Sequence, residues 1–118
     1  MKYRKPTYQE LKLIDFLVKL AEPNMNATGF SDALMVTDMA DGNMGSLRLY
    51  PDATVVENSA FGKQASACQF ADVDGIDVIA SLNVDQFGGL YELDLWKTDY
   101  STLLQLPEDM TKVQPMIE

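Results

Sequence analysis

Three aspartates lie close together around Gly75 in the stretch DVDGID, at Asp72, Asp74 and Asp77. Closely spaced carboxylates are ligands that calcium and magnesium prefer. A calcium loop of the EF-hand type needs a twelve-residue frame that ends in glutamate, and the frame that begins at Asp72 ends in Asn83. The order Asp-x-Asp-Gly is instead typical of a type I turn followed by a left-handed glycine. The stretch therefore predicts a hairpin with a three-residue loop, and a weak metal site at the three aspartates is the alternative.

The register of this hairpin follows from its apolar residues. A three-residue loop sets Phe70 and Cys68 beside Val78 and Ala80 on one face of the sheet. A two-residue loop would exchange the faces of one strand and separate these side chains. The apolar pattern therefore selects the three-residue loop.

Apolar and polar side chains alternate along residues 90–97 (LYELDLWK). Tyr91, Leu93 and Leu95 recur at every second position, which predicts a strand with these three side chains in the core. The other face and the residues beside it carry the candidate binding residues, which are Arg48, Glu92, Asp94, Trp96, Lys97 and Asp99.

Trp96 on an otherwise polar face has two interpretations. It anchors a partner, because tryptophan and arginine dominate interaction hot spots, or the leucines of residues 103–106 cover it. Glu92 and Asp94 form a carboxylate pair of the kind that glycosidases use. Alternating acids on a strand are more often a solvated face, so we expect binding rather than catalysis.

The composition excludes several kinds of chemistry. The chain has no histidine, which rules out histidine-based nucleophile pairs, zinc sites and general bases. A single cysteine, Cys68, forms neither an internal disulfide nor a four-cysteine zinc site. We expect no cofactor, and an enzyme here would depend on carboxylates, lysine, tyrosine or the one thiol.

The charge balance indicates the kind of partner. The chain has 9 basic and 18 acidic residues and a net charge of −9. Such a field repels nucleic acid and anionic lipid and attracts basic proteins. No apolar run approaches the length of about 20 residues that crosses a bilayer, and the N-terminal MKYRKPTYQE is not a signal peptide. We therefore expect a cytoplasmic bacterial protein that binds neither nucleic acid nor membrane.

The pattern along the chain predicts one helix followed by strands. Thr7 and Glu10 form a capping box, the apolar residues behind them recur at helical spacing, and Pro23 ends the helix. From residue 33 the period changes to two. The expected strands are 33–39, 46–50, 65–71, 76–84 and 90–97, whereas residues 52–64 show no clear pattern.

Short turns between strands favour antiparallel neighbours. The sequence therefore predicts a single α+β domain over residues 1–118. Its N-terminal helix packs on a roughly five-stranded antiparallel meander sheet, and residues 107–118 form a flexible C-terminal tail with a short helical turn.

Several motifs together resemble a family of small uncharacterised bacterial proteins with a domain of unknown function. They are the helix opening RKPTYQE, the Asp-Gly-x-Met-Gly-Ser turn in TDMADGNMGSL, the Asp-x-Asp-Gly hairpin and the Glu-Leu-Asp-x-Trp-Lys-x-Asp strand. The similarity spans most of the chain except residues 52–64 and the last dozen. This resemblance carries no established activity. By analogy with other small acidic proteins of such groups, it suggests an immunity protein against a secreted toxin.

The sequence thus predicts a non-enzymatic protein-binding module, similar to an immunity protein, that engages a basic partner through the polar sheet face. The alternative is a small-ligand binder or carboxylate-based enzyme with a pocket near residues 41–46 and 85–99. The protein is expected to be a monomer, or a homodimer that buries Trp96 at its own interface.

Overall fold

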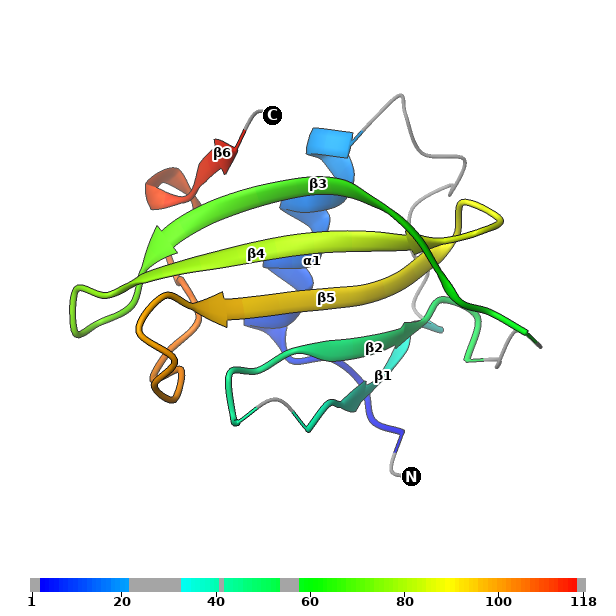
Figure 1. Ribbon diagram of the computed structural model, residues 1–118, viewed down its shortest axis with the longest axis horizontal. Helices are drawn as coiled ribbons and strands as arrows, with labels where there is room; N and C mark the ends of the chain where they lie inside the picture. Colours follow the sequence, from blue (N-terminus) through cyan, green and yellow to red (C-terminus); the bar gives the residue numbers. More distant parts are fainter. Residues whose placement is uncertain (1–2, 22–32, 41, 54–57, 117–118) are drawn as a thin grey trace.

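The computed structural model describes residues 3–21, 33–40, 42–53 and 58–116. Within them it contains one α-helix, α1 (Tyr8–Ala21), one short 3-10 helix, η1 (Met110–Lys112), and six strands. The strands are β1 (Met35–Asp38), β2 (Leu47–Tyr50), β3 (Phe61–Ala71), β4 (Asp77–Asp85), β5 (Leu90–Lys97) and β6 (Gln114–Met116). All strand pairs are antiparallel, in the sheet order β1-β2-β5-β4-β3-β6. Helix α1 lies across one face of this sheet, which confirms the predicted α+β fold (Figure 1).

The start of α1 has the predicted capping box. The Glu10 N–H donates to Thr7 Oγ1 at 3.2 Å, and the Thr7 N–H donates to Glu10 Oε1 at 2.8 Å. These two bonds satisfy amide groups that have no partner within the helix. No helix in the described part of the chain is long and apolar enough to cross a membrane.

Arg4 joins the start of α1 to the edge of the sheet. Its guanidinium donates two hydrogen bonds to Glu10, at 2.9 and 3.0 Å, and two to Asp38 at the end of β1, at 3.1 and 2.8 Å. The backbone of Arg4 also pairs with Val36 in β1. The hydrogen bond from Arg4 holds the pKa of Asp38 below its ordinary value. One side chain therefore fixes where the helix begins relative to β1.

The core lies between α1 and the sheet. The helix contributes the buried side chains of Leu13, Ile14, Leu17 and Val18. The strands contribute alternate residues, as the period of two requires. These are Val36, Leu47, Leu49, Cys68, Phe70, Val78, Ala80, Leu82, Leu90, Leu93 and Leu95. Burial raises the pKa of the Cys68 thiol to about 12, so this cysteine behaves as a small apolar side chain.

The hairpin between β3 and β4 has the predicted three-residue loop. The Asp72 N–H donates to Ile76 O at 2.9 Å, and the Gly75 N–H donates to Asp72 O at 2.8 Å. Gly75 has a φ of +84°, a conformation that glycine adopts without steric cost. Phe70 pairs with Val78 and Cys68 pairs with Ala80, which confirms the register.

The strand order departs from a simple meander at β2. Strands β3, β4 and β5 follow one another, but β2 pairs with β5 rather than with β3. This pairing sets Leu47 beside Leu93 and extends the apolar face under α1. The sequence gives no direct sign of it, because the period of two does not identify the neighbouring strand.

Strand β3 begins at Phe61, four residues before the predicted start at 65. Register shifts lie between Phe61 and Lys63 and between Gln64 and Ser66. Such irregularities break the alternation of apolar and polar residues, which explains why residues 52–64 showed no pattern. Of that stretch, residues 54–57 lie outside the described residues.

The segment after residue 107 packs on the protein over most of its length. Val113 is buried in the core, and Gln114, Pro115 and Met116 pair with β3. The predicted short helical turn is η1. Within the described residues the sheet consequently has six strands rather than about five.

The prediction that Tyr91 faces the core was wrong. Asn83 pairs with Glu92 but Val84 pairs with Leu90, so the extra residue Tyr91 forms a bulge. A bulge reverses the alternation on one side of it. Leu90 therefore enters the core, whereas Leu93 is buried as predicted.

Candidate functional site

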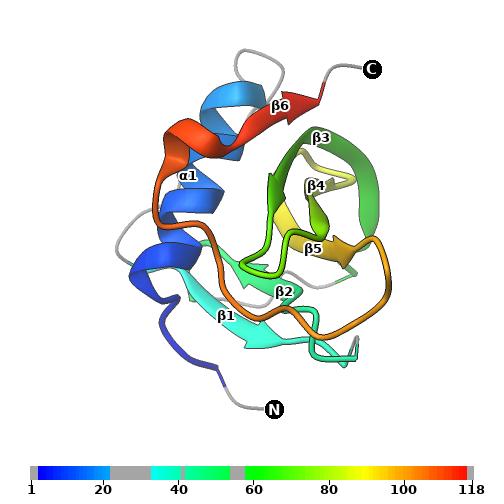
Figure 2. The same cartoon turned by 90° about the vertical axis from the view of Figure 1, so that its left-hand side faces the viewer.

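The face of the sheet opposite α1, here called the outer face, is the candidate binding surface. No helix in the described part of the chain covers it (Figures 1 and 2). The cross-strand pairs Arg48–Glu92 and Asn83–Glu92 run across it, and Asp94 pairs with Ser81 nearer the end of β5. The outer face carries the predicted residues Arg48, Glu92, Asp94 and Trp96.

Arg48 packs on an aromatic ring. Its guanidinium carbon lies 3.9 Å from the centre of the Tyr91 ring, a cation–π arrangement that restricts both side chains. The bulge in β5 makes this contact, because it turns Tyr91 away from the core. Arg48 and Tyr91 therefore form a packed pair on the outer face.

Trp96 lies near the other end of β5, where it pairs with Ile79. Its side chain is 38% exposed, and its ring centre lies 5.9 Å from that of Tyr100, with 56° between the planes. Leu103 and Leu106, two leucines that were candidates to cover Trp96, pack against the core. The indole is thus partly covered and partly open to solvent, whereas Tyr100 is mostly exposed.

Asp94 is exposed on the outer face, beside the link between β2 and β5. The Ser46 hydroxyl accepts the Leu95 N–H at 2.8 Å and lies 3.3 Å from Asp94 Oδ1. The buried Ser46 therefore holds the start of β2 on β5. The Asp94 carboxylate remains at the surface, two residues before Trp96.

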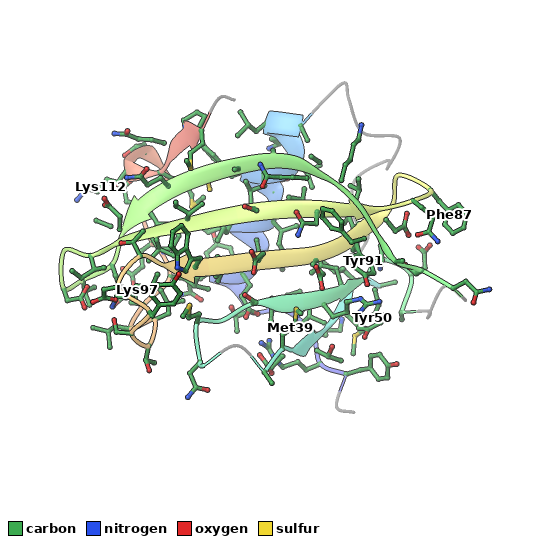
Figure 3. The ribbon with its side chains drawn as sticks, viewed as in Figure 1. Met39, Tyr50, Phe87, Tyr91, Lys97 and Lys112 are labelled. Atoms are coloured by element: carbon green, nitrogen blue, oxygen red, sulfur yellow. The ribbon has the colours of Figure 1, made fainter. Side chains whose placement is uncertain are left out.

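Lys97 does not lie on the outer face. Its side chain is only 1% exposed and points into the end of the molecule, where Nζ lies 2.9 Å from Asp72 Oδ2 and 2.7 Å from Asp74 Oδ2. Nζ also donates to Thr102 O at 3.2 Å. Figure 3 shows Lys97 at one end of β5, and Tyr91 and Phe87 toward the other. Burial lowers the pKa of Lys97, but the hydrogen bonds to Asp74 and Asp72 outweigh it and raise that pKa.

Asp72 organises the same end of the molecule. Its fully buried carboxylate accepts Lys97 and the backbone N–H groups of Val73, Leu104 and Gln105, the last two at 2.8 and 3.1 Å. Asp72 therefore holds the segment that follows β5 against the β3–β4 hairpin. We call Asp72, Asp74 and Lys97 the ion cluster.

The ion cluster bears on the metal alternative. The cation that Asp72 and Asp74 bind is the ammonium of Lys97. Asp77 is exposed at the start of β4. Among the described residues, no group of three or more acidic, cysteine or histidine side chains is arranged to hold a metal ion. Asp72 and Asp74 turn the chain and neutralise a buried lysine.

Asp72 is expected to make the stability of the protein depend on pH in acid. Burial raises the pKa of its carboxyl, but hydrogen bonds from the Leu104 N–H and Lys97 outweigh burial and hold the pKa below its ordinary value. The folded protein thus binds fewer protons than the unfolded chain. The stabilisation is present above the ordinary pKa of about 3.9 and is lost as the pH falls through the folded value.

Urea unfolding of the wild type and of Asp72→Asn at several pH values measures this dependence. We expect the difference in free energy of unfolding between the two proteins to be constant near neutral pH and to shrink below about pH 4. A difference that stays constant down to pH 2.5 would show that the carboxylate charge of Asp72 does not stabilise the fold.

Asp99 shapes the turn after β5. Its Oδ1 accepts the Ser101 hydroxyl at 2.6 Å and the Ser101 N–H at 3.0 Å. These bonds hold the pKa of Asp99 below its ordinary value, so the carboxylate remains charged at neutral pH. Asp99 therefore lies at the end of the sheet beside Tyr100 rather than on β5 itself.

The sequence predicts a pocket near residues 41–46 and 85–99, and side chains occupy the space over Gly45 in the first of these segments. A Cβ built on Gly45 would lie 3.1 Å from the side chains of Leu95 and Leu103, which fill that space. A hollow of about 430 Å³ is lined by Gly62, Lys63 and residues 84–88, so it includes part of the predicted 85–99 region but none of residues 42–46. The one buried acid there, Asp85, accepts the N–H groups of Phe87 and Gly89 and serves the β4–β5 turn.

Tyr100 is the surface residue that the sequence analysis missed. It follows the predicted strand in the stretch WKTDY, and an aromatic residue in a polar turn was the signal that was available. The partners of Lys97 were missed as well, because Asp72 lies 25 positions earlier in the chain.

Comparison with known proteins agrees with the motifs. No curated protein and no solved structure matches the chain. A family model matches residues 3–107, which include the helix opening, the glycine turn, the hairpin and strand β5. The chain therefore belongs to the family described as a domain of unknown function (DUF6984).

Proposed function

We propose that the protein is a non-enzymatic binding module that engages a basic protein through the outer face of its sheet. The observation that carries this proposal is the half-exposed Trp96 among the acidic residues of that face. A large aromatic side chain that the fold does not fully bury is a common anchor of protein interfaces.

The charge of the chain supports a basic partner. The net charge of −9 attracts a positive surface from a distance and speeds association, and salt weakens this effect. Glu92 and Asp94 lie on the same face as Trp96, so the general attraction and the aromatic anchor act at one surface. A secreted toxin with a basic surface is a partner of this kind, which corresponds to the immunity-protein analogy.

The packing of the outer face also favours binding. Arg48 is stacked on Tyr91, and β5 is paired on both sides, by β2 and β4. A surface that is already ordered loses little conformational freedom when a partner docks. The proposed interface therefore needs no rearrangement of the sheet.

Affinity capture from the native host at low salt tests the proposal, with Trp96→Ala and Asp94→Ala as variants. Loss of a hot-spot tryptophan is expected to weaken binding of a captured basic partner about 30-fold or more, which corresponds to about 2 kcal/mol. Asp94→Ala is expected to slow association and to reduce its dependence on salt. Surface plasmon resonance with the purified partner measures both effects.

Asp15→Asn is the matched control, because it removes one negative charge from α1, on the other side of the sheet. Binding that is equally sensitive to Asp15→Asn and Asp94→Ala would show a general charge effect and no specific surface. Light scattering of the protein alone tests whether the protein forms a homodimer through the outer face instead. A stable dimer that Trp96→Ala dissociates would assign the outer face to a second copy of the chain.

A further inference from the structure

We propose that Trp96 and Tyr100 receive an arginine side chain of the basic partner, with the guanidinium against the two rings. This inference deepens the proposed function and rests on it. It names the chemical group that is recognised and adds Tyr100 to the binding surface.

The first observation is the geometry of the ring pair. The ring centres are 5.9 Å apart and the planes are inclined by 56°, so the two faces do not cover each other as in a stacked pair. Tyr100 is 72% exposed. The faces that remain open carry the negative charge density to which a cation binds, and a planar guanidinium also stacks on them.

The second observation is the backbone of Tyr100. Its φ is +64°, in the left-handed region that non-glycine residues rarely adopt and that is unfavourable for bulky side chains. The exposed ring buries little surface to offset this cost. Strained backbone conformations of this kind persist where surrounding contacts fix them, and they are found most often at functional sites. The strained position of Tyr100 therefore supports a binding role for its ring.

The third observation is that hydrogen bonds hold the turn at Tyr100 both before and after this residue. The Tyr100 N–H donates to Lys97 O at 2.8 Å, and the Asp99 carboxylate accepts the N–H and the hydroxyl of Ser101. The ion cluster then fixes Lys97, whose ammonium also holds Thr102 O. The ring of Tyr100 is thus placed beside Trp96 before any ligand arrives.

The charges around the pair favour a cation. Asp94 lies two residues before Trp96 on the same face, Asp99 precedes Tyr100, and the backbone of Asp77 pairs with Thr98 in the same corner. The nearest basic side chain along the chain, Lys97, is buried and neutralised by two aspartates. An arginine of the partner therefore meets aromatic faces near carboxylates, and the charge of the adjacent Lys97 is already neutralised.

A direct test uses the isolated protein and two peptides, tri-arginine and tri-citrulline, which have similar shape but differ in charge. Trp96 is the only tryptophan in the sequence, so its fluorescence reports binding at this place. We expect saturable quenching by tri-arginine that weakens with salt, and no saturable change with tri-citrulline. Equal response to the two peptides would overturn the inference.

Tyr100→Gly separates recognition from folding. Glycine relieves the backbone strain, so Tm is expected to rise by roughly 2–5 °C, while the affinity for tri-arginine falls at least fivefold. Ala53→Gly is the matched control, because Ala53 also has a positive φ, of +56°, but lies next to β2. This control is expected to raise Tm without a change in peptide affinity.

The outcomes distinguish the two proposals. A Tyr100→Gly variant that keeps its affinity for tri-arginine, or that loses stability, contradicts the inference. The proposed function still stands in that case if a basic partner is captured through Trp96. Binding of tri-arginine by a protein that captures no basic partner would contradict the proposed function. Failure of both measurements contradicts both proposals.

Discussion

Replacing Asp72 by alanine is expected to lower the free energy of unfolding by about 3–5 kcal/mol, as is typical when one member of a buried ion pair is removed. The side chains of Asp72 and Lys97 are 0% and 1% exposed, so water does not replace the lost carboxylate. The substitution also removes the acceptor of the Leu104 and Gln105 N–H groups. Urea or guanidinium unfolding, followed by circular dichroism, measures the change.

Two variants serve as comparisons for Asp72→Ala. Lys97→Met is expected to cost less, because Asp72 keeps three backbone N–H donors and Asp74 becomes solvated. Lys19→Ala removes an exposed i,i+4 pair with Asp15 and is expected to cost about 0.3–0.5 kcal/mol. A loss for Asp72→Ala no larger than that for Lys19→Ala would contradict the structural role of the ion cluster.

Leu93→Ala is expected to destabilise the protein by about 2–5 kcal/mol, the range for deletion of a buried leucine side chain. Leu93 is fully buried at the centre of the sheet, between Leu47 in β2 and Leu82 in β4. The cavity left by the substitution borders two neighbouring strands that cannot both move into it without loss of their other contacts. Denaturant unfolding gives the value.

Asp94→Ala is the control for Leu93→Ala, because the two residues are adjacent in β5 but point to opposite faces. Asp94 is exposed, and its substitution is expected to change the free energy of unfolding by no more than about 0.5 kcal/mol. Similar losses for the two variants would contradict the register of β5 and, with it, the definition of the outer face.

The regular strands could be predicted because a half-buried strand has a period of two. Strand β5 matches the predicted range 90–97, and β4 differs by one residue at each end from 76–84. The turn chemistry of Asp-x-Asp-Gly fixed the loop length between β3 and β4, and the apolar residues confirmed its register. Local patterns therefore identified the elements that form the centre of the sheet.

Irregular and long-range features could not be predicted in the same way. The bulge at Tyr91 depends on how β4 and β5 align at one end, and no residue type in the stretch requires it. In the sequence, Lys97 has the pattern of a surface residue at the end of a strand. Its partners Asp72 and Asp74 reach it only because the β3–β4 hairpin lies beside the end of β5. The exposed ring of Tyr100 likewise depends on a backbone conformation that its residue type disfavours.

The burial of Lys97 has a consequence for chemical labelling. Amine-reactive reagents modify lysines that are free to reach solvent, and the Lys97 amine is enclosed and bonded to three acceptors. Its acylation requires the segment after β5 to leave the β3–β4 hairpin, so the labelling rate reports how often that end of the molecule opens. Mass spectrometry of the labelled protein thus follows opening at this one corner in the absence of any binding partner.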